Sequence, residues 1–368
     1  MSRDAIFGGQ KGMADPMVEV GRYERRFGAA ESPEKTGGEG EAPEKGKSGE
    51  TAIETCTGLE VPGDSETAVW LSDPVEASPF DWLVPWWAAD ISGEGFVETE
   101  LQVETVKGWS AWYKLGRWSV RPQSFSAGDA DGKVETDTLL LSGRSTRFRY
   151  RLSLGAPGYR GSARIRRFGV LTRDRHAPKS HGDLGKLPLS LVTSSISVPA
   201  RSQMTERQQI KGRICSPTCC AMALEALGLD YPTSFVAEDC RDYGAEIYGN
   251  WPFCVASLGR LGAEARLDFF PNLEAAAVEL AKGHILIASV AFRENELDGA
   301  PIKASSGHLI LVRGLARRED GGFAVLVNDP ASGDVSGVMR EYDAAQFESV
   351  WKGVAYVVEG RRGARPAG

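Results

Sequence analysis

The chain contains 368 residues with a formal net charge of −7, and acidic and basic residues are mixed along the sequence. This balance excludes a broad basic field for nucleic acid or for an anionic membrane surface, and no apolar run is long enough to span a bilayer. The length suits about two domains plus a tail, and six cysteines are too few to form a disulfide framework for a chain of this size.

Residues 1–60 form the first distinct region, which is rich in Glu, Lys, Gly, Pro and Ser. Such a composition buries too little apolar area to offset the entropy of ordering the chain, so we expect a disordered acidic tail. The first residues contain no hydrophobic signal core. We therefore expect a cytoplasmic protein, or a secreted one if the start codon has been misassigned.

The next region, residues 61–172, has a hydrophobic period of two. Residues 97–104 alternate apolar with acidic or amide side chains, and residues 147–154 alternate apolar side chains mostly with arginine. These patterns predict half-buried strands, and their opposite outer charges suggest that the two strands are neighbours. Further strands are predicted near 67–72, 110–115, 134–141 and 163–171. With the Gly, Pro and Asp-Gly turns between them, they predict an accessory β-sandwich domain.

Two features of this β region admit a functional interpretation. The first is a set of large aromatic residues that would suit stacking on a glycan or peptide if exposed, although such residues more often fill a sandwich core: Trp86, Trp87, Trp109, Trp112, Tyr113 and Trp118. The second is the segment 129–132, Asp-Ala-Asp-Gly, which lacks the first acidic ligand and the closing glutamate of a calcium loop. We expect a turn there and no metal.

Residues 173–196 have the composition of a linker, with several Gly, Pro and His residues. His176 and His181 are five residues apart, so they could share a metal ion, but solvated histidines are the commoner occurrence in a linker. We expect this linker to decouple the β region from a second domain over 197–360. Residues 361–368 are predicted to be a flexible tail.

The second domain is organised around a cysteine that directly precedes a helix start. Ser216 is a favoured N-cap residue and Pro217 suits the first helical position, so we expect a helix over 217–227. Backbone N–H groups at a helix N-terminus carry about half a positive charge, which lowers the pKa of a thiol below its free value of roughly 8.5. Cys215 is therefore the candidate nucleophile.

Two histidines are candidates for the general base that a nucleophilic cysteine needs. His284 begins a run that predicts a buried central strand, and we identify no acidic partner for it. His308 begins another apolar β-type run, which forms a predicted hairpin with residues 323–327. Symmetric pairing would place His308 opposite about residue 333, so Asp329 reaches it only through an asymmetric loop or a bulge. We favour His308.

Four ordered motifs over 190–360 resemble the bacteriocin-processing cysteine peptidases, cysteine peptidase family 39, and more closely their stand-alone bacterial relatives without a transporter. The motifs are VPARSQM (198–204), CSPTCCAMAL (215–224), GHLILVRG (307–314) and VNDPA (327–331). The resemblance implies a papain-like fold with Cys215 as nucleophile, His308 as base and Asp329 as its orienting partner. The relatives also carry a similar Trp-rich N-terminal domain.

The resemblance further implies a glutamine ahead of the cysteine as a donor to the oxyanion, and two glutamines compete for this role. Gln203 lies in the Val-Pro-x-x-Ser-Gln context of the relatives, whereas Gln209 lies six residues before Cys215, a spacing that papain-like enzymes often show. We favour Gln203 and keep Gln209 as the alternative.

Cys219 and Cys220 stand where the relatives usually have small hydroxyl residues. Cys219 could act as a resolving thiol for an oxidised Cys215, but free cysteines are commonly buried as small apolar groups. A metal site built from these three cysteines would lack a second ligand pair of the usual zinc kind. We expect packing cysteines, with no metal and no cofactor.

Together these patterns predict an α+β protein in which an N-terminal all-β sandwich precedes a papain-like cysteine peptidase domain. The expected function is hydrolysis of peptide bonds in a peptide or protein substrate. Two alternatives stay open: a papain-like acyl transferase or deamidase, and a non-catalytic binding protein whose sandwich captures a glycan or protein ligand. The cleavage after two glycines that is performed by transporter-fused relatives is not carried over to this chain.

Overall fold

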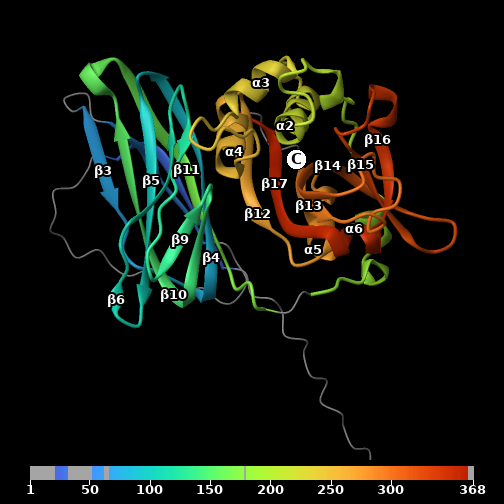
Figure 1. Cartoon of the computed structure of the whole chain (residues 1–368), viewed down its shortest axis with the longest axis horizontal. Coiled ribbons are helices and arrows are strands. Elements are labelled where there is room, and N and C mark those ends of the chain that lie inside the picture. The colour runs from blue at the N-terminus through green and yellow to red at the C-terminus, as the bar shows by residue number, and fades with distance from the viewer. Residues whose placement is uncertain (1–20, 32–51, 62–65, 178–179, 364–368) are drawn as a thin grey trace, which may run out of the picture.

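The structure is a computed structural model that describes residues 21–31, 52–61, 66–177 and 180–363, with side chains described from residue 59 onward. Figure 1 shows an all-β domain beside a domain of helices and strands, which confirms the predicted fold class. Within these residues, no helix has the length and apolar character that a membrane span requires.

The N-terminal domain, which we call the β domain, contains eleven strands among the described residues. Their bounds are β1 Gly21–Glu31, β2 Ala52–Glu60, β3 Thr67–Leu71, β4 Val75–Gly93, β5 Phe96–Thr105, β6 Gly108–Trp109, β7 Tyr113–Trp118, β8 Gln123–Ser124, β9 Gly132–Glu135, β10 Thr138–Gly155 and β11 Gly161–Arg173. One short 3-10 helix, Pro157–Tyr159, joins the last two strands.

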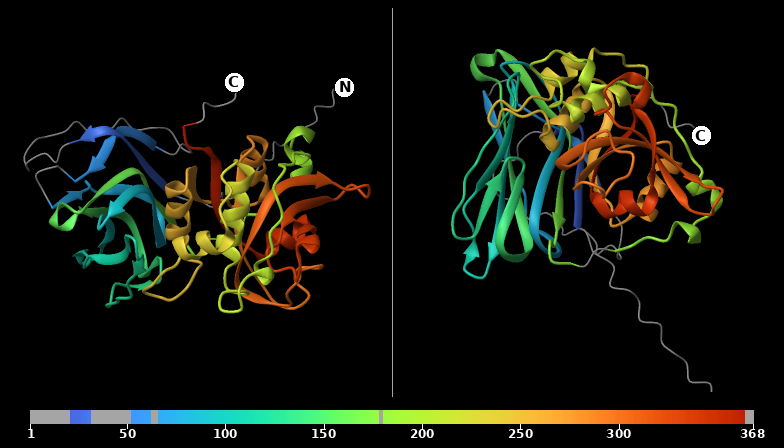
Figure 2. Two further views of the ribbon diagram at one scale, coloured as in Figure 1. Left: turned by 90° about the horizontal axis from the view of Figure 1, so that it is seen from above. Right: turned by 45° about the vertical axis from the view of Figure 1, so that its right-hand side comes forward.

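Long strands that are shared between neighbours bend this sheet around its buried face. The first part of β4 pairs with β10, and residues 82–93 of β4 pair with β11. Figure 2 shows the resulting curvature. The predicted pairing of the acidic and basic strands is confirmed, since β5 lies beside β10 and Arg151 pairs with Glu100 across the two strands.

The structure differs from the predicted tail in two segments. Where residues 1–60 were expected to be disordered, β1 and β2 pair with each other and with β11 at the edge of the sheet. Composition missed these strands because their backbone groups bond to a partner more than 100 residues away. The rest of that expectation, over 1–20 and 32–51, lies outside the described residues.

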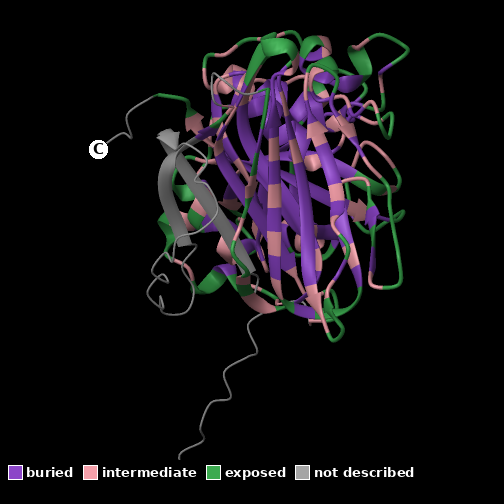
Figure 3. Ribbon diagram, turned by 90° about the vertical axis from the view of Figure 1, so that its left-hand side faces the viewer, coloured by how far each residue is buried: buried purple, intermediate pink, exposed green. Residues whose placement is uncertain are grey.

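Most of the large aromatic residues of the β domain fill its core, as expected. Trp86, Trp87 and Trp118 are at most 2% exposed, and Figure 3 shows buried residues running along the central strands. Trp109 and Trp112 are partly exposed, but Arg149 lies over both rings. These side chains therefore do not form an open stacking platform for a glycan.

The C-terminal domain has a six-stranded sheet in the order β12-β17-β13-β14-β15-β16. Its elements are α1 Leu189–Val192, α2 Cys215–Ala226, α3 Thr233–Asp239, α4 Trp251–Arg260, β12 Ala263–Phe269, α5 Leu273–Ala281, β13 Ile285–Phe292, β14 Ser305–Arg317, β15 Phe323–Asn328, β16 Met339–Asp343, α6 Ala344–Val350 and β17 Trp351–Arg361, with 3-10 helices at Leu184–Lys186, Gln203–Thr205 and Val335–Gly337.

Helices cover both faces of this sheet. Ile287 and Leu309 pack with α2, α3 and α4 in one core, whereas Leu286 and Ile310 pack with α1, α5 and α6 in another. Successive side chains of β13 and β14 thus point to opposite cores, as strand geometry requires. This arrangement holds α2 against the end of β14 at which His308 lies.

The two domains share hydrophobic cores across their interface. Phe253 of α4 lies 6.0 Å from the ring of Trp87 and 5.8 Å from that of Trp118, and it belongs to the core of the β domain. The predicted linker also packs on the C-terminal domain, where Leu184 and Val192 are buried. The decoupling that we expected from residues 173–196 is therefore not what the structure shows.

Candidate functional site

The candidate nucleophile lies at the first position of a buried helix. Helix α2 begins at Cys215 with Ile214 as its N-cap residue, two residues earlier than predicted. Ser216 is not the cap, because its buried hydroxyl instead lies 3.1 Å from the Cys254 Sγ and 2.9 Å from the Tyr356 hydroxyl. Cys215 is therefore within the first turn, where unpaired backbone N–H groups favour negative charge.

His308 makes contact with this thiol from β14. Burial by itself would raise the pKa of Cys215, but the hydrogen bond with His308 and its positive charge lower that pKa below the ordinary value of 9.0. Burial likewise opposes protonation of His308, yet its contacts with Asp329 and Cys215 raise its pKa to about 10. The lowered pKa of Cys215 and the raised pKa of His308 both favour a thiolate and imidazolium pair.

A buried carboxylate orients the imidazole. The Nε2 of His308 lies 2.8 Å from the Oδ1 of Asp329, which leaves Nδ1 for the thiol. Asp329 is 0% exposed, and burial opposes its ionisation. Hydrogen bonds from His308, the Ala331 N–H and the Tyr342 hydroxyl nevertheless hold its pKa below the ordinary value. Tyr342, on β16, donates to Oδ2 at 2.7 Å and was not anticipated from the sequence.

The hairpin of β14 and β15 contains a bulge, which is one of the two irregularities through which we expected Asp329 to reach His308. Strands β14 and β15 pair Leu311 with Asn328, and the register shifts between Val312 and Gly314. Asp329 follows the last residue of β15, and its N–H donates to the Val338 carbonyl at 2.8 Å. Continued past Leu311 and Asn328, this register places Asp329 opposite Ile310, so the carboxylate reaches His308, at 2.8 Å, from beyond the end of β15.

The two glutamines lie in different environments. Gln203 is 4% exposed, and its Oε1 accepts a hydrogen bond from the Ile214 N–H at 3.1 Å, directly before Cys215. The backbone N–H of Gln203 donates to the carbonyl of Pro330 at 2.9 Å, and Pro330 follows Asp329 in the chain. Gln209 is exposed in a turn. The structure therefore brings Gln203, and not Gln209, to the residues around Cys215.

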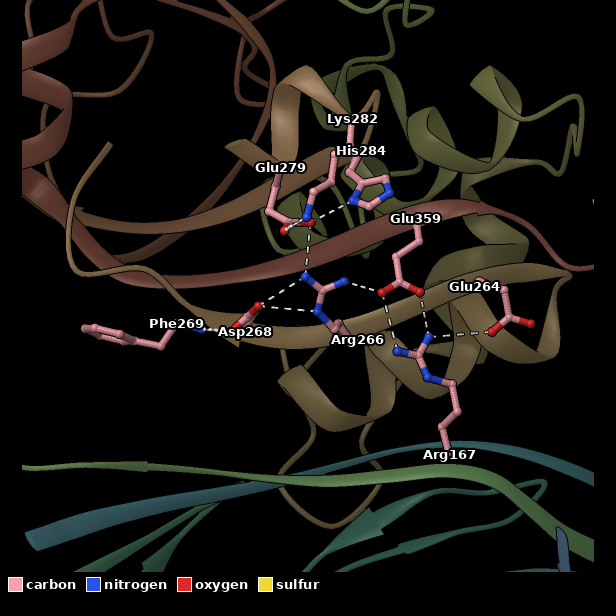
Figure 4. Close-up of polar contacts among 9 residues, drawn as sticks. All are labelled: Arg167, Glu264, Arg266, Asp268, Phe269, Glu279, Lys282, His284 and Glu359. Atoms are coloured by element: carbon pink, nitrogen blue, oxygen red, sulfur yellow. Dashed lines mark hydrogen bonds and ion pairs between the residues drawn. The ribbon is translucent and has the colours of Figure 1, made fainter. Parts of the chain in front are cut away.

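His284, the rival base, lies in an ion-pair network with Glu279 and Arg266 (Figure 4). Contrary to our expectation it has an acidic partner, since its Nδ1 lies 2.7 Å from the Oε2 of Glu279. Glu279 also pairs with Arg266 at 3.1 Å and with Lys282 at 2.8 Å. Sequence inspection missed this pair because Glu279 lies on α5, whereas His284 lies after the end of that helix, directly before β13.

The remaining cysteines are buried behind the site. The Cys219 thiol lies 3.4 Å from the Leu309 carbonyl, and burial raises its pKa well above the ordinary value, which makes it a poor nucleophile. The sulfur atoms of Cys220, Cys240 and Cys254 lie within 4.8 Å of one another, close enough to share a soft metal ion. Three ligands are one fewer than a structural zinc site uses.

The other two histidines do not come together on a shared partner. His176 lies 3.3 Å from Asp81 of the β domain, and His181 lies 3.6 Å from Glu348 of α6. Both rings are largely exposed, as we expected for solvated histidines.

Cys215 opens onto a cleft with a volume of about 440 Å³. The C-terminal domain lines it with residues that include Tyr248, Trp251 and Leu309, and the β domain contributes the turn 135–137. A peptide segment can reach the thiol through this cleft. The contribution of the β domain was not visible in the sequence.

Comparisons with known proteins give matches to both domains. Residues 195–358 match the peptidase C39-like family, and residues 39–173 match the peptidase C39 N-terminal domain. No curated protein matches the chain.

Three solved structures are similar to part of this chain. A double-glycine-motif protease from an AMS/PCAT transporter, in complex with a leader peptide, is 17% identical, with a TM-score of 0.29, covering 44% of this chain and 91% of its own. The peptidase domain of Streptococcus ComA is 14% identical, with a TM-score of 0.30 and coverages of 44% and 98%. A chain described as a C39-like peptidase from Bacillus anthracis is 16% identical, with a TM-score of 0.33 and coverages of 46% and 99%.

Proposed function

We propose, from the match of residues 195–358 to the C39-like peptidase family, that the chain is a cysteine peptidase that hydrolyses peptide bonds. In this proposal Cys215 is the nucleophile, His308 the general base and acid, and Asp329 the group that orients His308. The observation that carries it is the buried hydrogen bond between His308 and Asp329 at 2.8 Å, together with the effect of His308 on Cys215, whose pKa it lowers.

The reaction follows from the charges of the resting pair. The Cys215 thiolate attacks the carbonyl carbon of the peptide bond, and the electrons of the C=O bond move onto its oxygen. The His308 imidazolium then gives its proton to the leaving amine as the C–N bond breaks. Water hydrolyses the resulting thioester, and His308 accepts the proton of that water. Asp329 keeps the ring in place throughout and does not take the proton.

Gln203 is our proposed donor to the oxyanion. Its Oε1 is held by the Ile214 N–H, so the amide nitrogen is the end of the side chain that remains available to a substrate oxygen. The N-terminal turn of α2 adds unpaired N–H groups on the same side of the thiol.

The contacts of His308 also bear on the alternative functions. A degenerate binding scaffold has no use for a histidine that lowers the pKa of a cysteine, so the pair supports an enzyme. A transferase or a deamidase would use the same pair with another acceptor or another amide, and the products distinguish these reactions.

The test combines labelling with product analysis on the full chain. Wild-type protein should be alkylated by iodoacetamide at Cys215 near neutral pH and should release two peptide fragments, identified by mass spectrometry, from a cleavable peptide. Cys215→Ala should do neither while its melting temperature stays within about 2 °C. Unaltered cleavage by Cys215→Ala would refute the proposal, and transfer of the acyl group to an added amine in place of hydrolysis would favour the transferase.

A further inference from the structure

The cleft in front of Cys215 is built by two domains. Glu135, Thr136 and Asp137 form the tip of the hairpin between β9 and β10, and all three line the cleft together with Cys215. Figure 1 shows β9 on the side of the β domain that faces the C-terminal domain. A peptide that reaches the thiol must therefore pass this tip.

The tip is attached to the C-terminal domain through the start of α4. The Oδ2 of Asp137 accepts a hydrogen bond from the Trp251 N–H at 2.9 Å, and Trp251 is the first residue of α4. A carboxylate is favoured at this position by the unpaired N–H groups of the first helical turn. Two residues further along, Phe253 packs against Trp87 and Trp118 of the β domain. These contacts hold the hairpin at a fixed place beside the cleft.

The backbone of the tip is strained. Thr136 has a φ of 60°, a conformation that is unfavourable for a β-branched residue. Such strain persists only where the surrounding structure imposes it, and it is concentrated at functional sites. The turn therefore keeps a shape that a glycine or asparagine would adopt more easily.

The two walls of the cleft carry opposite charges. Glu135 is an exposed acid on the β-domain wall, whose only described ion pair is with the exposed Lys133, a kind of contact that contributes little. Arg213 and Lys352 lie on the wall of the C-terminal domain. Among the described residues, neither of these two basic side chains has a carboxylate within ion-pair distance. Arg213 donates to the Glu246 carbonyl at 3.0 Å and Lys352 to the Ser306 carbonyl at 2.9 Å, so each side chain is held by a neutral group that does not cancel its charge.

We propose that the β-domain hairpin is part of the substrate-binding site, and that Glu135 selects peptides with a basic residue on the β-domain side of the cleft. This inference rests on the proposed peptidase function and deepens it. The β domain is then a fixed wall of the substrate site, and the peptide lies between an acidic and a basic wall. Asp137 is a positioning residue in this arrangement, because it acts through the hairpin and α4.

The experiment profiles cleavage of a peptide library that is randomised around the cleaved bond. Wild-type protein should enrich Lys and Arg at one position. In Glu135→Lys this enrichment should disappear, and KM for a Lys peptide should rise about five- to tenfold relative to its Gln counterpart, with kcat little changed. Labelling of Cys215 by iodoacetamide should be the same in both proteins, because the thiol and His308 are untouched.

Glu94→Lys is the matched control. Glu94 lies in the turn between β4 and β5 and forms one exposed ion pair, with Arg160 at 3.2 Å. Its replacement makes the same change in net charge and also breaks one surface pair, but Glu94 does not line the cleft. Glu94→Lys should keep the wild-type profile. A Glu135→Lys profile that equals that of Glu94→Lys would overturn the inference.

A binding measurement separates this inference from the proposed function. Library peptides that bind Cys215→Ala protein should lose affinity about five- to tenfold when Glu135→Lys is added, but not when Glu94→Lys is added. Equal affinities for all three proteins would overturn the inference even if wild-type protein cleaves these peptides. Conversely, if Cys215 is not activated and no peptide is cut, the peptidase proposal fails while the binding arm still decides the role of Glu135.

Discussion

His308 and His284 each make a short hydrogen bond with a carboxylate, and the two pairs differ in what surrounds them. His308 faces Asp329 at 2.8 Å and has the Cys215 thiol on its other side. His284 faces Glu279 at 2.7 Å, but that carboxylate is shared with Arg266 and Lys282. The comparison teaches that a histidine with an acid is not by itself a catalytic pair.

The two carboxylates also differ in the groups that contact them. Asp329 accepts its other hydrogen bonds from neutral groups, the Tyr342 hydroxyl and the Ala331 N–H, so its negative charge stabilises the imidazolium. Burial opposes the ionisation of Glu279, but its hydrogen bonds with His284 and Lys282 and the charge of Arg266 lower its pKa. Its charge belongs to a network that also contains Asp268 and Glu359 (Figure 4).

The largest expected effect separates the two histidines directly. His308→Ala should lower kcat/KM for a cleaved peptide by at least about 1,000-fold, because the thiolate loses its counter-ion and the leaving amine its acid. His284→Ala should stay within about threefold of wild type. Steady-state kinetics on both variants measure this. If His284→Ala lost as much activity as His308→Ala at an unchanged melting temperature, the assignment of the base would be wrong.

A second comparison concerns Gln203 and Gln209, the two candidate donors to the oxyanion. Gln203→Ala should lower kcat by about 100-fold, the usual consequence of removing one donor, whereas Gln209→Ala should have little effect because the residue is exposed. Both are measured with the same peptide. A reversed order would show that the six-residue spacing before Cys215 was the better guide.

The pH dependence of labelling tests the ion pair. With the pKa of Cys215 lowered and that of His308 raised to about 10, the pair persists at neutral pH, is lost when the thiolate is protonated in acid, and loses its imidazolium as the pH rises through about 10. His308→Ala should shift the alkylation midpoint upward and slow labelling at pH 7 by roughly tenfold or more. His284→Ala should leave the profile unchanged, and a shift in that variant would contradict the comparison.

Replacing Asp329 or Glu279 should have the smallest effects on turnover. The first change should affect mainly activity and the second mainly stability. Asp329→Ala should weaken activity, by about tenfold or more, since it orients the ring without accepting the proton. Glu279→Ala should leave kcat nearly unchanged but lower the free energy of unfolding by about 1–3 kcal/mol, because Arg266 and His284 lose a partner. Kinetics and denaturant unfolding give the two readouts. Equal loss of activity in both variants would remove the distinction.

Local sequence signals were sufficient for several features of this protein. The helix that follows the candidate nucleophile, the apolar run that begins at His308 and the alternating strands of the β domain are set by residues close in the chain. Their periods can therefore be identified without tertiary information, although the N-cap of the helix is Ile214 and not the predicted Ser216. Asp329 was expected to reach His308 only through an asymmetric loop or a bulge in the hairpin, and the structure contains a bulge.

The sequence by itself determined the order of the domains, the α+β character and the small set of residues from which a catalytic group can be drawn. Only the tertiary structure decided which of them meet. Tyr342 on Asp329 and Asp137 at the start of α4 are contacts between different elements, and no local period predicts them. The strands β1 and β2 likewise depend on the edge that β11 offers. Side chains distant in sequence meet through packing of whole sheets and helices, and that packing is where the cleft and its charged walls are formed.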